Sequence, residues 1–293
     1  MIPKSINRSI VAYLNNTHHI QDAEILATKP VGGGSINQAY QLKTNYGKFF
    51  LKYNEPSRYP KMFQKEARGL NLLRRPGIIS VPEVLLVDET KEHAFLLLEH
   101  VDSASERPDF WDGFGEKLAG LHKVKSEKFG LDHDNYMGSL HQHNNYHDDW
   151  TEFFIVERLE PQVKMAREDE RIGRSDVSGF ERLYKRLEEI FPPTKPSLIH
   201  GDLWSGNFMV DDKGEACLID PAVYFGHPEI DIAMSTLFGG FSQQFYEAYN
   251  RHNPMEKGWQ NRLEIYNLYP LMVHVNLFGG GYLSSVQGVL RRF

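Results

Sequence analysis

The stretch HGDLWSGNFMVDDKGEACLIDPAVYFGH, residues 200–227, places three oxygen-bearing side chains among short apolar runs. NFMV and EACLID are typical of two strands, and DDKG, residues 211–214, is the turn expected between them. A hairpin brings its beginning and end close together, so Asn207 and Asp220 are expected to face one space. Their amide and carboxylate oxygens are ligands that suit magnesium. Asp202, in the polar loop before the hairpin, would then be free to accept a proton.

These three groups also have a plainer interpretation. Asp and Asn side chains commonly bond their own backbone in turns, so all three could simply stabilise loops. Their spacing inside hydrophobic strands favours a shared ligand instead. If that ligand is a nucleotide triphosphate, its phosphates need donors from elsewhere in the chain as well as a metal ion.

Such donors are available upstream, where the pattern predicts a strand, a glycine triplet and a hairpin. Gly32, Gly33 and Gly34 have no β-carbons, so their amides can approach phosphate oxygens closely. Lys52 in the hairpin can add a positive charge, and Glu66 on a predicted helix can pair with it. Each of these residues alone is more typical of a flexible turn or a solvated surface, but the ordered set favours a phosphate site. The GxxxxGK[ST] pattern of a Walker loop is absent.

The remaining segments predict two lobes. Residues 58–101 have the pattern of a helix followed by two strands, which completes a small mixed β-sheet lobe of about five strands. From Asp109 onward the pattern is mainly helical. A chain of 293 residues also exceeds what one hydrophobic core usually serves. We therefore predict an α+β fold with an N-terminal lobe over residues 1–101 and a mainly helical C-terminal lobe over residues 102–293.

The composition limits the partners and the compartment. Lys and Arg total 33 against 39 Asp and Glu, and the net charge of −6 disfavours nucleic acid as a partner. The single cysteine, Cys217, falls in a predicted strand, which is typical of a small buried thiol in a reducing compartment. The first residues lack a charged leader before an apolar core, and no apolar run is long enough to cross a bilayer. These features predict a cytoplasmic protein with no membrane partner.

Segments in order along nearly the whole chain resemble the successive motifs of the fructosamine kinase, or ketosamine kinase, family. They are GGGSINQAY, FFLKY, KEARGL, LLLEHV, HGDLWSGN and IDPAVYFGH. The resemblance implies a protein-kinase-like fold of two lobes, close to that of aminoglycoside phosphotransferases. Members of the family transfer the γ-phosphate of ATP to the 3-hydroxyl of a ketosamine, the rearranged adduct of a reducing sugar and an amine. The phosphorylated sugar then leaves spontaneously, which repairs the amine.

The resemblance also implies a role for each candidate residue. Asp202 would be the catalytic base, and Asn207 and Asp220 would hold magnesium. Lys52 would contact the α- and β-phosphates of ATP and pair with Glu66. The glycine loop would cover the phosphates.

Adenine and the sugar would be bound by other parts of the chain. The backbone at Glu99 and Val101 would meet adenine in the hinge between the lobes. Trp204 and His274 match positions that line the sugar site, where an indole can pack against sugar C–H groups and an imidazole can hydrogen-bond hydroxyls. Core packing is the alternative for both residues, and it is favoured for a lone histidine on an apolar helix.

The chain departs from related patterns in two places. Many relatives carry a cysteine after the glycine triplet, where it can act as a redox switch, but this chain has Ser35, so we expect no disulfide-linked regulation. Compared with protein kinases, the chain has HGD in place of HRD and DPA in place of DFG, and no APE segment follows. Control by phosphorylation of an activation loop is therefore not expected.

Other interpretations stay open. A kinase of the same fold could act on an aminoglycoside, choline or another small alcohol, and a non-catalytic nucleotide-binding scaffold is the alternative from a different class. Lys52, Asp202 and Asp220 argue against the scaffold. Five histidines could suggest a transition-metal site, namely His18, His19, His141, His143 and His147. The interpretation of these histidines as solvated loop residues is favoured. We expect a monomer whose substrate is a small-molecule or protein-bound ketosamine.

Overall fold

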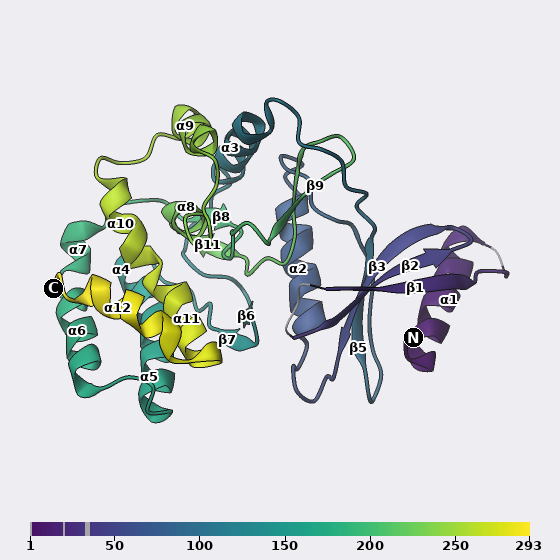
Figure 1. The fold of residues 1–293 in the computed structure, drawn as a ribbon, viewed down its shortest axis with the longest axis horizontal. Coiled ribbons are helices and arrows are strands. Elements are labelled where there is room, and N and C mark those ends of the chain that lie inside the picture. The colour runs from purple at the N-terminus through teal and green to yellow at the C-terminus, as the bar shows by residue number, and fades with distance from the viewer. Residues whose placement is uncertain (1, 20, 33–35) are drawn as a thin grey trace.

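The computed structural model describes residues 2–19, 21–32 and 36–293, and Figure 1 shows a β-sheet on one side of the molecule and most of the helices on the other. The sheet joins five strands in the order β1-β2-β3-β5-β4 and is antiparallel in each of its pairings. Its strands are β1 (Ile25–Val31), β2 (Gln38–Thr44), β3 (Gly47–Asn54), β4 (Val84–Glu89) and β5 (Ala94–Glu99). The predicted small sheet is therefore present, and the α+β class is confirmed.

Two helices cover opposite faces of this sheet. They are α1 (Lys4–His18) and α2 (Met62–Arg74). Ile10 of α1 shares an apolar cluster with Leu51 and Leu97, whereas Leu70 of α2 shares another with Leu98. Neighbouring residues of a strand point to opposite faces, so one strand serves both clusters. This explains the unbroken apolar run of the inner strand β5, which is buried on both sides.

The part of the chain after the sheet is mainly helical, as predicted. Its helices are α3 (Phe110–Leu121), α4 (Trp150–Phe153), the π-helix η1 (Phe154–Leu159), α5 (Glu160–Glu168), α6 (Arg174–Tyr184), α7 (Leu187–Ile190), α8 (Glu229–Met234), α9 (Gln243–His252), α10 (Trp259–Tyr266), α11 (Leu268–Phe278), the 3-10 turn η2 (Gly280–Tyr282) and α12 (Leu283–Leu290). The pattern of residues 148–165 is typical of one helix, and the structure forms it as a continuous succession of α4, η1 and α5.

Short two-stranded sheets lie among these helices. Their strands are β6 (Asn135–Met137), β7 (Leu140–Gln142), β8 (Ser197–Ile199), β9 (Phe208–Val210), β10 (Ala216–Leu218) and β11 (Tyr224–Gly226). β9 pairs with β10, β8 with β11, and β6 with β7. The apolar run SLIH, residues 197–200, predicts the strand found at β8, and the two strands of the predicted hairpin form as β9 and β10. β6, β7 and β11 were not predicted, because they are as short and do not flank the turn that was recognised at residues 211–214.

The two halves of the molecule share apolar packing. One cluster joins Leu70 of α2 and Leu98 of β5 to Phe114 of α3 and Tyr249 of α9. The backbone N–H of Leu218 also donates to the carbonyl of Ser80, at 2.9 Å. The lobe boundary after residue 101 stays a prediction, and these contacts show that the chain on either side of it packs together.

Two expectations from composition can be compared with the structure. Cys217 is buried, and burial raises the pKa of its thiol to about 12, so it is the inert small core residue that was predicted. Every helix in the described part of the chain is too short or too polar to span a bilayer.

Candidate active site

The hairpin predicted from residues 207–220 forms and brings its two ends together. Leu218 of β10 lies opposite Phe208 of β9, and the N–H of Ile219 donates to the carbonyl of Asn207 at 3.0 Å. At the other end, the N–H of Gly214 donates to the carbonyl of Asp211, also at 3.0 Å, and closes the turn. Asn207 and the residue before Asp220 are therefore direct neighbours, as expected from the sequence.

Asp202 is held against the same end of the hairpin. The Asn207 side-chain NH₂ group donates to the Asp202 carbonyl at 2.8 Å and to its carboxylate Oδ2 at 2.9 Å. Burial raises the pKa of Asp202 well above its usual value; the Asn207 hydrogen bond opposes this, and the charges of Asp220 and Asp231 add to it. A carboxylate whose pKa is raised in this way is a better proton acceptor than a solvated one.

Asp231, near the start of α8, holds the loop that carries Asp202 in place. The backbone N–H groups of His200 and Gly201 donate to the two Asp231 carboxylate oxygens, at 2.7 and 2.8 Å. His122, the residue that follows α3, lies 3.1 Å from the same carboxylate through Nε2. Gly201 has φ +81°, and a β-carbon there would lie 2.2 Å from the carbonyl oxygen of Ala222, so the loop requires glycine.

From its position at the start of a helix-like segment, Asp231 could cap the helix or hold the catalytic loop, and these contacts match the second role. His122 was not identified, because it follows a helix far away in the sequence and nothing in its own segment marks it. Burial lowers the pKa of His200, whereas the charge of Asp231 raises it. Burial has the larger effect, so the pKa of His200 is lowered. His200 therefore stays neutral beneath the loop.

Lys52 of β3 links the sheet to the hairpin. Its Nζ lies 2.8 Å from Glu66 Oε1 of α2 and forms an ion pair with the Asp220 carboxylate. Only 7% of Lys52 is exposed, whereas the Asp220 side chain is 47% exposed. Burial alone would lower the pKa of Lys52, but Asp220 and Glu66 outweigh it, so the net pKa is raised and the ammonium stays charged. The predicted pairing of Lys52 with Glu66 is thus present.

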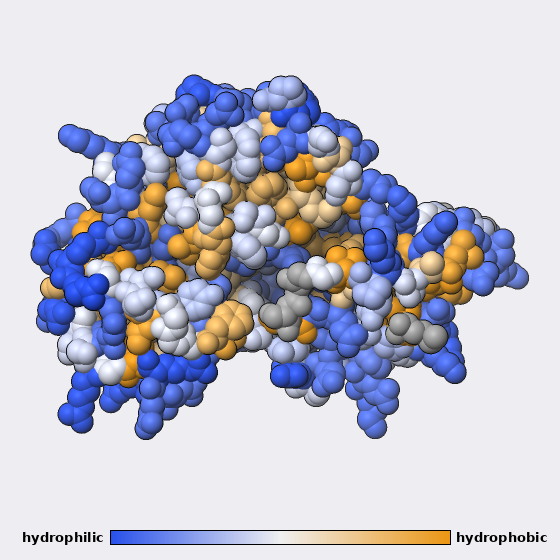
Figure 2. Space-filling view, in the orientation of Figure 1, coloured by the Kyte–Doolittle hydropathy of each residue, from blue (hydrophilic) through white to orange (hydrophobic). Residues whose placement is uncertain are grey.

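A cavity of about 500 Å³ lies between the sheet and the hairpin, where Figure 2 shows the surface hollowed between the two halves of the molecule. Candidate residues from both halves line it: Gly32, Lys52, Glu99, Val101, Trp204, Asn207 and Asp220. Apolar side chains add to its walls, among them Phe50 and Leu98 from the sheet and Ile219 from the hairpin. The expected contacts of Gly33, Gly34 and Ser35 lie outside the described residues.

Three candidates stand outside the lining of this cavity. Glu66 is hydrogen-bonded to Lys52, and Asp202 is hydrogen-bonded to Asn207, and both of these partners line the cavity. His274 is on α11, where its Nδ1 is 2.7 Å from the carbonyl of Pro270. The sequence does not reveal which of the candidate side chains line the cavity, because this depends on the direction in which each side chain points.

An aromatic cluster connects Trp204 with His274. The Trp204 ring lies 5.7 Å from Phe238, and Phe238 lies 5.0 Å from the His274 ring, measured between ring centroids. Tyr282 and Phe278 complete the cluster at 4.8 and 5.5 Å from His274. Phe278 is 60% exposed, so part of the cluster faces solvent. Trp204 and His274 were identified from the sequence, but the other three rings were not; they come from a loop (Phe238), the end of α11 (Phe278) and η2 (Tyr282).

The chain matches a family model described as fructosamine kinase over residues 7–293. It is 41% identical over 266 residues to a probable ketoamine kinase of Enterococcus faecium, covering 90% of this chain and 94% of the relative. It is 37% identical over 266 residues to the chloroplastic protein-ribulosamine 3-kinase of Arabidopsis thaliana, covering 89% of this chain and 80% of that protein.

The chain also matches solved structures over nearly its whole length. A Haemophilus somnus protein provisionally assigned as a fructosamine-3-kinase matches with a TM-score of 0.87 and 31% identity, covering 97% of this chain and 96% of the other. The aminoglycoside phosphotransferase APH(4)-Ia matches with a TM-score of 0.63 and 15% identity, covering 97% of this chain and 98% of the other. At 15% identity, the similarity to APH(4)-Ia concerns the fold alone, and it confirms the predicted protein-kinase-like fold.

Proposed function

Because this chain belongs to the fructosamine kinase family, we propose that it transfers the γ-phosphoryl group of ATP to the 3-hydroxyl of a ketosamine. The observation that carries the proposal is the match to the family over nearly the whole chain. The geometry supports it, since Lys52, Asn207 and Asp220 line one cavity between the sheet and the hairpin, and Asp202 is hydrogen-bonded to Asn207.

The donor set at the cavity fits magnesium. Asp220 offers a carboxylate whose side chain is about half exposed, and Asn207 uses its amide nitrogen for Asp202, which leaves its amide oxygen as the potential ligand. One or two protein oxygens, completed by phosphate and water, are what magnesium prefers in kinases. When bound, the ion would neutralise charge on the phosphates. Asn207 and Asp220 are therefore the proposed magnesium ligands.

The nucleotide would lie with its phosphates near Lys52 and its base at the hinge. The Lys52 ammonium is kept charged and is oriented by Glu66, so it can contact the α- and β-phosphates. Gly32 lines the same cavity and begins the glycine loop, whose other residues are Gly33, Gly34 and Ser35. Glu99 and Val101 line the opposite part, and their backbone is proposed to meet adenine.

Asp202 is the proposed catalytic base. Its carboxylate would accept the proton of the substrate 3-hydroxyl, whose oxygen forms a bond to the γ-phosphorus as the bond to the β–γ bridging oxygen breaks. The hydrogen bond from Asn207 keeps the Asp202 carboxylate oriented, and the Asp231 contacts keep its loop in place. Most of the rate enhancement would come from this positioning and from charge neutralisation.

The acceptor sugar would bind against the aromatic cluster that includes Trp204 and His274. Trp204 lies two residues after Asp202 and lines the cavity, so its indole is close enough in the chain to present a sugar to the base. Indole faces pack well against sugar C–H groups. The exposed Phe278 ring extends this surface outward, toward the position where the amine part of a ketosamine would continue.

The proposal is tested by incubating the protein with ATP, Mg²⁺ and synthetic adducts of fructose, ribulose or erythrulose with lysine, followed by mass spectrometry. We expect one phosphoryl group to be added to at least one ketosamine. Choline and an aminoglycoside are included in parallel as acceptors. Transfer to these alone would replace the ketosamine with another small alcohol, and measurable ATP affinity without transfer to any acceptor would indicate a scaffold.

A further inference from the structure

Two histidines of the β6–β7 hairpin point to the same side of the strand, away from the core. Residues i and i+2 of a strand share a face. His141 lies within β7, and His143 follows one residue after its end. Gln142 between them points inward, where it is buried and donates hydrogen bonds to Asn135 and to the carbonyl of Ala222. The position of the buried Gln142 therefore places both imidazoles on the outer face.

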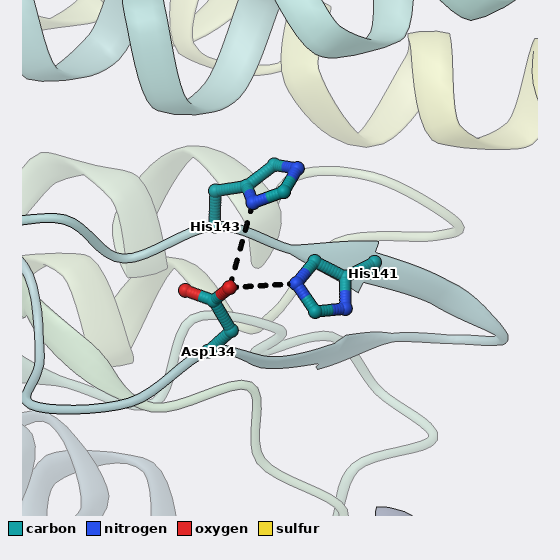
Figure 3. Close-up of side chains that lie close together, drawn as sticks. All are labelled: Asp134, His141 and His143. Carbon is teal, nitrogen blue, oxygen red and sulfur yellow. Dashed lines mark hydrogen bonds and ion pairs between the residues drawn. The ribbon is translucent and has the colours of Figure 1, made fainter. Parts of the chain in front are cut away.

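Asp134, immediately before β6, completes this cluster (Figure 3). Its Oδ2 atom is 2.7 Å from His141 Nε2 and 3.5 Å from His143 Nδ1. The two imidazole rings are 4.6 Å apart between centroids, and the three potential ligand atoms all lie within 4.8 Å of one another. A zinc ion with bonds of about 2.0 to 2.2 Å to nitrogen and oxygen fits among atoms at this spacing after small side-chain rotations.

The carboxylate and the second histidine are anchored by contacts behind them. The N–H of Asn144 donates to Asp134 Oδ1 at 2.9 Å, which leaves Oδ2 directed at the histidines. The backbone carbonyl of His143 accepts a hydrogen bond from Arg158, which is fully buried. Such supporting contacts orient metal ligands and strengthen binding. The three ligand side chains themselves stay accessible, with exposed fractions of 33% for Asp134 and 45% for each histidine.

We propose that Asp134, His141 and His143 form a zinc-binding site. Two imidazole nitrogens and one carboxylate oxygen are a donor set typical of zinc, and solvent can supply the fourth ligand. Magnesium and calcium prefer oxygen ligands throughout and are not expected to bind here. The site is distinct from the kinase cavity, because none of its three residues lines that cavity.

Zinc at this site would brace the hairpin. Asp134 precedes the first strand, and His143 follows the second, so one ion would tie the two ends of the hairpin together. The hairpin in turn contacts the helix that carries Glu66: the Tyr136 hydroxyl donates to the carbonyl of Pro60 at 3.0 Å, and the Lys65 ammonium lies over the Tyr136 ring. Binding is therefore expected to raise the melting temperature of the protein.

The test is a titration of the metal-free protein with Zn²⁺ by calorimetry, and with Co²⁺ by visible absorption, in the absence of nucleotide. Wild type is compared with His143→Ala and Asp134→Asn; the asparagine oxygen can still accept from the Asn144 N–H, so the loop is kept. His252→Ala is the matched control, since His252 is exposed and lies 4.0 Å from Glu116 but has no second histidine beside it in the described contacts.

We expect wild type and His252→Ala to bind one equivalent of zinc with equal affinity and to melt at a higher temperature with zinc. His143→Ala and Asp134→Asn should each bind at least about tenfold more weakly, with loss of the thermal shift and of the intense absorption of tetrahedral Co²⁺. Equal affinity in all four proteins, or no binding by wild type, would overturn the proposal. Melting temperatures without metal show whether each variant is folded.

Discussion

Lys52 and Asp220 stand 168 positions apart in the sequence, yet their side chains form an ion pair across the cavity. One partner comes from the middle of the sheet and the other from the segment after the β9–β10 hairpin. Glu66 holds the opposite side of the same ammonium, so a single buried cation connects three elements of the fold. The Lys52 ammonium group thus links these three elements and is also the group proposed to contact the phosphates.

Replacement of Lys52 by methionine should destabilise the protein as well as inactivate it. The change leaves the nearly buried Glu66 carboxylate without its cation, and breaking such a buried pair costs about 3–5 kcal/mol. Asp220 also loses its partner, but its side chain is 47% exposed, so water compensates for part of that loss. Urea denaturation measures the effect. Lys52→Met combined with Glu66→Gln should recover part of the lost stability but none of the activity, and unchanged unfolding of the single variant would contradict this account.

Asp202→Asn should reduce kcat by about 10²- to 10⁴-fold, because the variant lacks the proton acceptor. The asparagine oxygen can still accept the hydrogen bond from Asn207, so the loop should keep its conformation and ATP affinity should change little. Turnover with ATP and a ketosamine, together with nucleotide binding by calorimetry, separates the two effects. Asp212→Asn, on the exposed hairpin turn, is the control and should behave as wild type. An Asp202→Asn variant with wild-type turnover would remove Asp202 from the mechanism.

Gly206→Ala should weaken binding of the acceptor by displacing the Trp204 ring. A β-carbon at residue 206 would lie 2.3 Å from that ring, so the indole must move. We expect the KM for the ketosamine to rise by about tenfold, a change typical of a reshaped apolar pocket, with a smaller change in the KM for ATP. Gly113→Ala serves as control, since a β-carbon there meets nothing within 4 Å. An equal effect on both KM values would argue against a sugar platform at Trp204.

Protonation of His227 should contribute to acid unfolding. Burial, followed by the charge of Arg262, lowers the pKa of His227 to about 3 from 6.5. Between these two pH values the unfolded chain binds a proton here that the folded chain does not, so the stabilising effect is complete above pH 6.5 and is lost as the pH falls. The slope from this residue reaches about 1.4 kcal/mol per pH unit.

His227→Asn keeps an oxygen that can accept from the Glu229 N–H, as the Nδ1 atom of His227 does at 3.1 Å, but it does not titrate. The free energy of unfolding of this variant should therefore depend less on pH between 4 and 6 than that of wild type. The exposed His252 provides the comparison through His252→Asn. If both variants keep the wild-type slope, burial of His227 is not a source of acid sensitivity.

Much of the fold could be predicted because its elements are local patterns. The β9–β10 hairpin followed from two apolar runs around residues 211–214, and it placed Asn207 beside the residue preceding Asp220 as expected. The sheet and the helix α2 that covers one of its faces also followed from alternation and helical spacing. These features depend on residues close together in the chain, where the period of the apolar pattern is informative.

The parts that could not be predicted depend on distant residues. The pairing of His122 with Asp231, and the contact of Phe238 with His274, have no counterpart in any local pattern. The histidines of the β6–β7 hairpin were interpreted as solvated loop residues because no pattern of supporting partners accompanies them in the sequence. Only the folded chain shows that Asp134 stands beside His141 and His143.

The apolar cluster that runs from α2 and β5 to α3 and α9 makes the molecule hard to divide. If the chain were divided after residue 101, each fragment would expose a large apolar surface to water and would tend to aggregate when expressed alone. Mixed together, the same surfaces are complementary, so the two pieces should reassemble into a working enzyme. A split reporter for this kinase could be built on that property.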